Sequence, residues 1–226
     1  MFVAICRRSR PFSKKFWSLA SKCHTPPRSR VGAIVARPKD EEKRQAIRDA
    51  VIAVVIEGGL ANVSVSKIAK RASVSPGTIY LYFANKEELI QQTYLDIKTD
   101  WFDTMFAAAD SGDDSAAKIR NMWFALFDFV VDRPNDFLFS ETVGAAHLID
   151  ASNEASIAKK IKKLEGVLTK AIKDGTLAKA PTASIQAVLM APAVQLAKTA
   201  ARDKKKVKPA LLRETFDIVW KGLAAA

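Results

Sequence analysis

The sequence predicts an all-α protein, and three observations support that prediction. Apolar residues recur at helical spacing through residues 39–226, beginning with Ile47, Val51, Val54 and Val55. Glycines, prolines and short polar stretches interrupt this pattern at intervals typical of helix–helix connections. No stretch of strand length alternates apolar and polar residues. We therefore expect an N-terminal three-helix unit over residues 39–86 and a second helical region over residues 87–226.

The charge of the chain is concentrated in its first residues. The 226 residues carry a net charge of +12, and residues 1–38 contain nine Lys or Arg and no Asp or Glu. Residues 39–226 hold 27 basic and 24 acidic residues, a net charge of only +3. The overall charge is therefore weak support for nucleic-acid binding by the folded part.

Three interpretations of the basic leader, residues 1–38, are open. It has the composition of a targeting segment, it could be a flexible arm that reaches DNA phosphates, or the true start lies near Val31 or Val35. We favour a disordered arm or a mis-assigned start.

The composition argues against an enzyme, a metal site and a membrane protein. Cys6 and Cys23 lie in the leader, and with His24 and His147 they show no metal-ligand spacing. No set of His, Cys or paired carboxylates suggests catalysis, so we expect no cofactor. The longest apolar run, residues 50–60, is too short to span a bilayer. We expect a cytoplasmic protein with no membrane partner.

The first four helices are marked by their terminal residues. The first begins among acidic residues 40–42 and ends at Gly58 and Gly59. Ser64 is the expected N-cap of a short helix over 65–72, and after a turn at 73–74 Ser75 caps a second one that starts with Pro76. Asn85 caps the next helix, with Glu88 in capping-box register.

The helical pattern continues to the end of the chain. Polar connectors, glycine and proline separate the expected helices 86–109, 115–132, 134–150, 154–174, 182–202 and 209–223. Pro192 inside the fifth of these predicts a kink near Leu189.

The two short helices and the turn between them form a helix-turn-helix. Ile79 and Phe83 lie four residues apart and are expected to face inward, whereas Gly77, Thr78 and Leu81 face outward. Small residues allow a close approach to a major groove, a hydroxyl can meet base edges, and Leu81 suits a thymine methyl. Two flanking tyrosines, Tyr80 and Tyr82, can donate hydrogen bonds to phosphates.

The segment SVSKIAKRASVSPGTIYLYFANKEEL, residues 64–89, resembles the DNA-binding signature of the tetracycline-repressor (TetR) family. The resemblance extends over residues 40–90. It implies that Ser64 binds a phosphate, that Pro76, Gly77 and Thr78 face the bases, and that Tyr80, Tyr82 and Lys86 hold the backbone. The expected DNA-binding set is Ser64, Ser75, Pro76, Gly77, Thr78, Tyr80, Leu81, Tyr82 and Lys86.

Two residues depart from the family signature. Ser73 stands where a turn glycine is usual, so a residue with a Cβ would take a left-handed conformation at modest cost. Tyr82 replaces a common histidine, a change that phosphate binding tolerates.

The resemblance also implies a ligand-binding and dimerising region. An aromatic pocket for a lipophilic or aromatic ligand is expected from Trp101, Met105, Trp123, Phe127, Phe137 and His147, with core packing as the alternative for each. A homodimer surface is expected from Ile185, Val188, Leu189, Leu196, Phe216, Val219 and Trp220, with an internal core as the alternative.

Together these patterns favour a sequence-specific DNA-binding regulator, a repressor that a small ligand releases from its operator. The alternative is an architectural or partner-recruiting DNA-binding protein of the same fold without an inducer.

Overall fold

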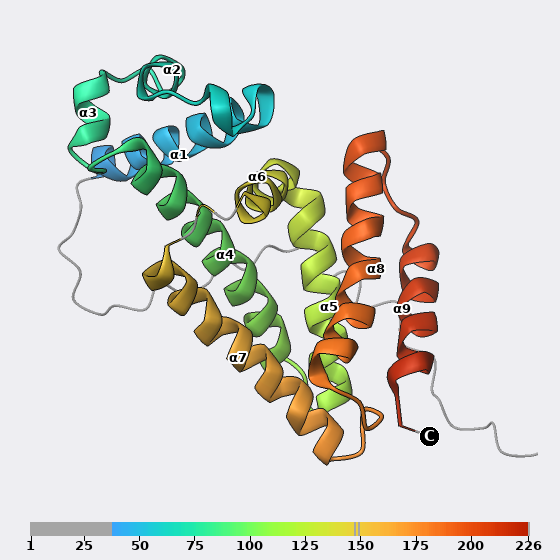
Figure 1. The fold of residues 1–226 in the computed structure, drawn as a ribbon. Coiled ribbons are helices and arrows are strands. Elements are labelled where there is room, and N and C mark those ends of the chain that lie inside the picture. The colour runs from blue at the N-terminus through green and yellow to red at the C-terminus, as the bar shows by residue number, and fades with distance from the viewer. Residues whose placement is uncertain (1–37, 147, 149, 226) are drawn as a thin grey trace, which may run out of the picture. The chain divides into compact units, whose positions relative to one another are not determined.

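The computed structural model describes residues 38–146, 148 and 150–225, and helices dominate these ranges (Figure 1). Within these ranges, the β-type pairing is a single antiparallel bridge between Leu177 and Ala224. The all-α prediction is confirmed. The elements are α1 (Pro38–Gly58), η1 (Leu60–Asn62), α2 (Val65–Arg71), α3 (Pro76–Tyr80), α4 (Lys86–Asp110), α5 (Ser115–Asp132), α6 (Pro134–Ala145), α7 (Ala151–Lys173), α8 (Thr182–Asp203) and α9 (Pro209–Leu223).

The expected helix termini are mostly confirmed, because local hydrogen bonds define them. The Ser64 side chain accepts from the Lys67 N–H at 3.3 Å, and the Asn85 side chain accepts from the Glu88 N–H at 2.7 Å. Glu88 in turn accepts from the Ala84 N–H at 2.5 Å, one residue before the N-cap, so its side chain also folds back on the start of the helix. Side chains therefore satisfy a free N–H at the start of α2, α3, α4, α5 and α7, whereas α6, α8 and α9 begin without a side-chain cap.

The connection between α6 and α7 differs from the expectation. The helix predicted over 134–150 ends at Ala145, and the next begins at Ala151 instead of residue 154. Asp150 explains the earlier start, because its side chain accepts from the Asn153 N–H at 2.9 Å and so acts as an N-cap. The expectations for residues 1–37 and His147 lie outside the described residues.

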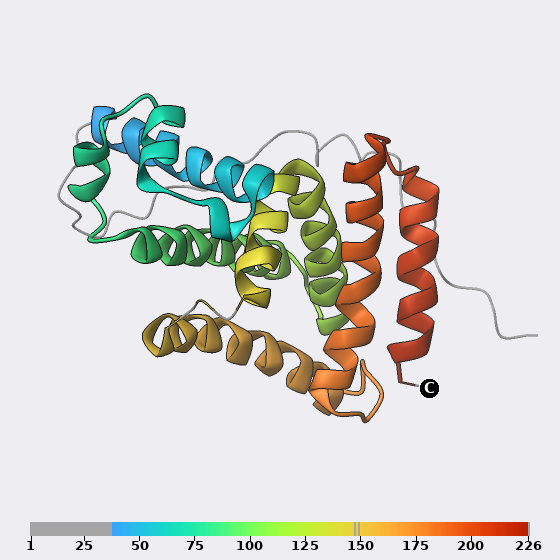
Figure 2. The same cartoon turned by 45° about the horizontal axis from the view of Figure 1, so that its top comes forward.

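The apolar side chains form two clusters, and α4 takes part in both. Leu89, Ile90 and Ile97 pack with the apolar faces of α1, α2 and α3, together with Phe139 of α6. Farther along the same helix, Met105 and others pack with α5, α7, α8 and α9. In both views α8 lies between α5 and α9 (Figures 1 and 2). The domain boundary expected at residues 86–87 stays a prediction, since the first half of α4 packs with the preceding helices.

The second cluster contains a buried polar contact beside a proline. The Trp123 indole N–H donates to the Leu189 carbonyl at 2.8 Å. Pro192 lies within α8 and has no N–H to donate to the carbonyl of Val188, four residues earlier. The helix therefore lacks one of its own hydrogen bonds directly beside the Leu189 carbonyl that Trp123 contacts. Trp123 is fully buried and its polar atom is satisfied, which marks it as a core residue.

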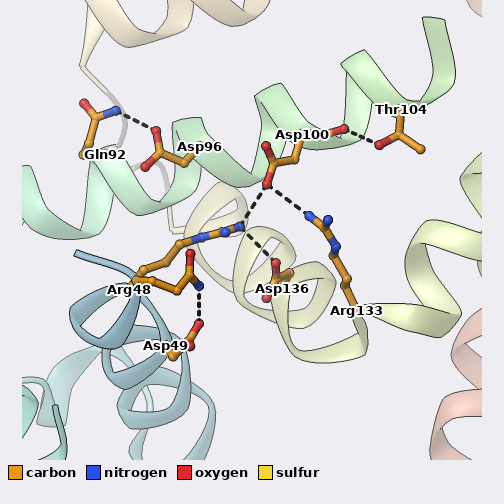
Figure 3. Close-up of polar contacts among 9 residues, drawn as sticks. Arg48, Asp49, Gln92, Asp96, Asp100, Thr104, Arg133 and Asp136 are labelled. Atoms are coloured by element: carbon orange, nitrogen blue, oxygen red, sulfur yellow. Dashed lines mark hydrogen bonds and ion pairs between the residues drawn. The ribbon is translucent and has the colours of Figure 1, made fainter. Parts of the chain in front are cut away.

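An ion-pair network joins α1 to α4 and α6 (Figure 3). The Arg48 guanidinium contacts Asp136 at 3.0 Å and Asp100 at 3.3 Å, and Arg133 contacts Asp100 at 3.0 Å. Only 18% of the Arg48 and Asp136 side chains is exposed. Burial raises the pKa of the Asp136 carboxyl, although Arg48 and Arg133 both act to lower it. The network fixes the position of α1 against two helices that follow it in sequence.

We expect Arg48→Met to lower the free energy of unfolding by about 1–3 kcal/mol. The methionine keeps much of the apolar stem but leaves Asp136 partly buried without its cation, and partial solvation reduces the loss below that of a fully buried pair. Urea unfolding at one fixed protein concentration measures the difference.

Lys43→Met is the matched control for Arg48→Met, because Lys43 is an exposed cation on the same helix. Replacing Asp136 by Leu in the Arg48→Met background should recover part of the loss. Equal stability of the Arg48 and Lys43 variants would show that the network contributes nothing.

Candidate nucleic-acid interface

The turn between α2 and α3 contains a residue in a strained conformation. Ser73 has a φ of 56°, in the left-handed region that glycine adopts most easily. The next N–H, that of Val74, donates to the Ala69 carbonyl at 3.0 Å. The turn therefore reverses the chain directly after α2 and sets the start of α3. The left-handed conformation expected for Ser73 is confirmed.

Helix α3 and the residues that directly follow it present one buried and one exposed face, as expected. Ile79 is 1% exposed and Phe83 is 9% exposed, and both pack in the first cluster. On the other face Leu81 is 81% exposed and Tyr80 is 54% exposed. A short helix held by its inner residues thus carries large, unpaired side chains into solvent.

The exposed face also has open space at its first turn. A Cβ placed on Gly77 would meet nothing nearer than the Ser75 Oγ at 3.8 Å, so packing within the chain does not require glycine there. The Ser75 side chain accepts from the Thr78 N–H at 3.2 Å, and the two hydroxyls are hydrogen-bonded at 2.9 Å. Pro76 follows Ser75 as the first residue of the helix.

The two tyrosines differ in their surroundings. The Tyr82 hydroxyl donates to Asp40 at 3.4 Å, and the Arg44 guanidinium lies 5.9 Å from the centre of the Tyr82 ring. Tyr82 is therefore held against the start of α1, whereas Tyr80 projects freely. Our sequence analysis missed Arg44. Its spacing of four residues from both Asp40 and Arg48 was the available signal, because such residues share one helix face.

The remaining phosphate-binding candidates lie at helix starts. Ser64 caps α2, and Lys86 is the first residue of α4, with its ammonium 3.5 Å from Glu87. The DNA-binding roles of the whole set stay predictions.

The expected ligand-pocket residues are mostly core residues. Met105, Trp123, Phe127 and Phe137 are buried, and Trp101 is partly buried against the same cluster. Trp123 lies toward α9, with its ring 5.3 Å from that of Phe216. Trp101 and Phe137 instead pack on each other, with ring centres 5.4 Å apart. A shared pocket for these residues stays a prediction.

Four of the seven expected dimer contacts are core residues of the chain itself. Ile185, Leu189, Phe216 and Val219 are at most 8% exposed, because the stripes that carry them face α5 and each other's helix. Leu196 and Trp220 are partly buried against the same cluster. Val188 is 51% exposed. Two apolar residues outside the expected set are also exposed on α9, Leu211 at 48% and Ile218 at 72%.

Lys98 is a second residue that our sequence analysis missed. Its ammonium lies 4.2 Å from the centre of the Trp101 ring and 5.5 Å from that of Tyr94. Burial lowers the pKa of Lys98 to about 8, against an opposing effect of the Glu141 charge. The available signal was a lysine four residues after one aromatic and three residues before another, which places all three on one helix face.

The described part of the chain has neither a metal-binding cluster nor a membrane-spanning helix. No group of three His, Cys, Asp or Glu side chains there could hold a metal ion. No helix there has the length and apolarity to cross a membrane.

Family profiles cover almost the whole described region. Residues 47–93 match the profile described as bacterial regulatory proteins, tetR family, and residues 89–225 match the tetracyclin repressor-like C-terminal domain. The chain belongs to the TetR family. As a member, it is a DNA-binding transcriptional regulator that binds operator DNA as a homodimer.

Similar proteins agree with this family membership. The TetR-family chain is 29% identical over 167 residues to an uncharacterised HTH-type transcriptional regulator of Haemophilus influenzae, covering 73% of this chain and 87% of that protein. It is 52% identical over 48 residues to the fatty acid metabolism regulator protein of Bacillus subtilis, covering 21% of this chain and 25% of that protein.

Solved structures share the fold. A TetR family transcription regulator from Marinobacter aquaeolei is 24% identical with a TM-score of 0.78, covering 84% of this chain and 100% of that chain. The regulator FadR from Bacillus subtilis, in complex with stearoyl-CoA, is 23% identical with a TM-score of 0.61, covering 79% of this chain and 98% of that chain.

We expect Ser73→Gly to raise the free energy of unfolding of this TetR-family chain by about 0.5–1 kcal/mol. Glycine removes the left-handed strain of about 1–2 kcal/mol and loses part of the gain to the larger entropy of its unfolded state. Thermal unfolding at a fixed concentration measures the shift. Ser73→Ala is the matched control, since alanine keeps the Cβ and should bring no gain. An equal rise in both variants would show that the side chain, and not the φ angle, is responsible.

Proposed function

We propose that this regulator is a cytoplasmic repressor, without enzymatic activity, that leaves its operator when a small lipophilic ligand binds. The observation that carries the proposal is the exposed face of α3. A leucine that is 81% exposed and a tyrosine that is 54% exposed stand beside a glycine that the fold does not need. A surface of this kind suits an operator major groove.

Each exposed residue of α3 has a chemical use in such a groove. Leu81 provides an apolar contact for a thymine methyl, and Thr78 offers a hydroxyl to base edges. Gly77 leaves room for the backbone of α3 to approach the bases. These contacts would provide sequence preference, because phosphate contacts alone carry none.

Phosphate contacts would come from the edges of the same surface. Tyr80 is free to donate its hydroxyl to a phosphate. Tyr82 would exchange its long hydrogen bond to Asp40, at 3.4 Å, for a shorter one to a phosphate oxygen. Ser64 and Lys86 would contact phosphates from the starts of α2 and α4.

The packing of α4 supports release by a ligand. This helix runs without interruption from Lys86, just after α3, to Asp110 in the second cluster. Arg48 ties α1 to Asp100 on the same helix. A ligand that favours another position of α4 would therefore also shift the helices that contact DNA, and its differential affinity would set the population of each state.

The similar proteins support a lipophilic ligand. One is named a fatty acid metabolism regulator, and another was solved with stearoyl-CoA. The apolar second cluster of this chain is compatible with a ligand of that kind.

Fluorescence anisotropy of the full chain on its own upstream intergenic DNA, beside a scrambled duplex, tests the proposal. We expect tight binding to the native duplex. Tyr80→Ala and Thr78→Ala should each weaken it roughly tenfold or more, from about 1–3 kcal/mol per contact. Lys162→Ala, an exposed change on α7, is the control and should have no effect.

Equal binding to both duplexes, with a steep dependence on salt concentration, would contradict the proposal. That result would mean phosphate attraction alone and would favour the architectural alternative.

The dimer surface of the chain has its own prediction. Ile218 is 72% exposed on α9, so we propose that it contributes to the contact between the subunits. Ile218→Glu would place a charge in a surface that loses its water on pairing, and we expect a monomer at micromolar concentration with weakened operator binding. Sedimentation velocity measures the state. Glu165→Gln on α7 is the control, and an Ile218→Glu variant that stays dimeric would exclude this surface.

A further inference from the structure

The aromatic residues of α4 and α6 form a continuous series of ring contacts. The ring centres of Trp101 and Phe102 are 6.3 Å apart, and those of Phe102 and Phe106 are 5.9 Å apart. Phe137 of α6 joins the series through Trp101 at 5.4 Å. We call Trp101, Phe102, Phe106 and Phe137 the aromatic series.

Lysine side chains from three helices lie on this aromatic series. Lys98 of α4 is 4.2 Å from the Trp101 ring centre, Lys163 of α7 is 4.1 Å from that of Phe106, and Lys198 of α8 is 5.7 Å from that of Phe137. Attraction to the ring faces holds cations in place without neutralising them. Three ammonium groups therefore lie around the aromatic series.

Lys98 differs from Lys198 in its lack of a counterion. Lys198 pairs with Glu141 at 2.7 Å, and that carboxylate is 44% exposed. Glu141 acts on Lys98 only through its charge at longer range, and no carboxylate in the described ranges lies within ion-pair distance of Lys98. Lys98 is also partly buried, so its ammonium has lost part of its solvation without gaining an anion.

The adjacent indole has the same deficit. The Trp101 Nε1–H is buried, and no described residue accepts its hydrogen bond. An ammonium and an indole N–H are donors only, so neither can satisfy the other. Buried donors without acceptors are rare in proteins, and this one lies on the face of α4 that also carries the partly buried Lys98, whose ammonium is 4.2 Å from the Trp101 ring centre. A negatively charged group that is rich in acceptors would pair with both donors.

We propose that Lys98 and the Trp101 N–H bind the anionic head of an amphipathic organic ligand, whose apolar part packs against the aromatic series. This inference rests on the proposed ligand-released function and specifies the class of its ligand. A neutral lipid would leave the Lys98 ammonium unpaired, whereas a carboxylate or a phosphate-bearing thioester would satisfy both donors. The other lysines would add longer-range attraction for the same charge.

Isothermal titration calorimetry of the full chain, without DNA, tests this site with three probes that share one alkyl chain: laurate, lauroyl-coenzyme A and lauryl alcohol. We expect at least one of the two anions to bind roughly tenfold tighter than the alcohol. Stronger binding of laurate would identify the head as a carboxylate, and stronger binding of the thioester would identify it as the phosphate-bearing group.

Three variants separate the site from general attraction. Lys98→Met should remove the preference for the anion and leave binding of the alcohol unchanged, and its thermal unfolding should show an intact fold because an unpaired, partly buried charge is gone. Trp101→Phe keeps the ring and loses the N–H, so it should reduce the preference severalfold. Lys162→Met, an exposed lysine of α7, should preserve it.

Three results would overturn the proposal: no binding of any probe, equal binding of the anions and the alcohol, or an unchanged preference in Lys98→Met. Because DNA is absent, these results are independent of the operator experiment. Binding to the operator but to none of the probes would support the regulatory function and contradict this ligand site. Binding to an anionic probe but not to the operator would support the ligand site and contradict the proposed function.

Discussion

The structure depends on one helix that belongs to two hydrophobic clusters. The first half of α4 packs with α1–α3, and its second half packs with α5, α7, α8 and α9. A helix with continuous backbone hydrogen bonds moves as a stiff element, so a displacement at either end is felt at the other. The ion pairs of Arg48 tie α1 to the middle of the same helix at Asp100 (Figure 3). The part of the chain that contacts DNA is therefore mechanically connected to the part that would contain a ligand.

Buried polar groups divide into two kinds in this chain, and the division indicates which are structural. The Arg48 guanidinium pairs with two carboxylates through its Nη2, although its Nε has no acceptor among the described residues, and the Trp123 N–H has a carbonyl, so folding compensates most of these groups. Lys98 and the Trp101 N–H lack acceptors among the described residues. Satisfied groups contribute to a unique fold, whereas donors that are buried and unpaired carry a cost that a ligand can remove.

In the α2–α3 region, several residues are not explained by packing or stability. Its inner residues and caps are sufficient to hold α3, and its outer residues serve no packing purpose. Leu81 lies almost wholly in water, Ser73 adopts a conformation that glycine would adopt more easily, and Gly77 is not required by any neighbour. Local choices that conflict with stability are expected at sites that contact a partner.

Most of the helices, several of their caps and the helix-turn-helix could be predicted from the sequence, because the responsible interactions join residues three or four positions apart. The termini at Ser64, Ser75 and Asn85 could be read in this way, whereas the left-handed Ser73 was expected from the resemblance to the family signature, in which glycine is usual at that position. Which apolar face of α8 and α9 is buried could not be predicted, since a stripe of apolar residues is equally compatible with a core and with a dimer surface until the helices are packed. The tertiary structure also decided the environments of Arg48 and Lys98. The partners of Arg48 lie 52 and 88 residues away, and the burial of Lys98 depends on how α4 packs with the helices around it. Local spacing carries no information about such contacts, because they exist only after distant helices have packed together.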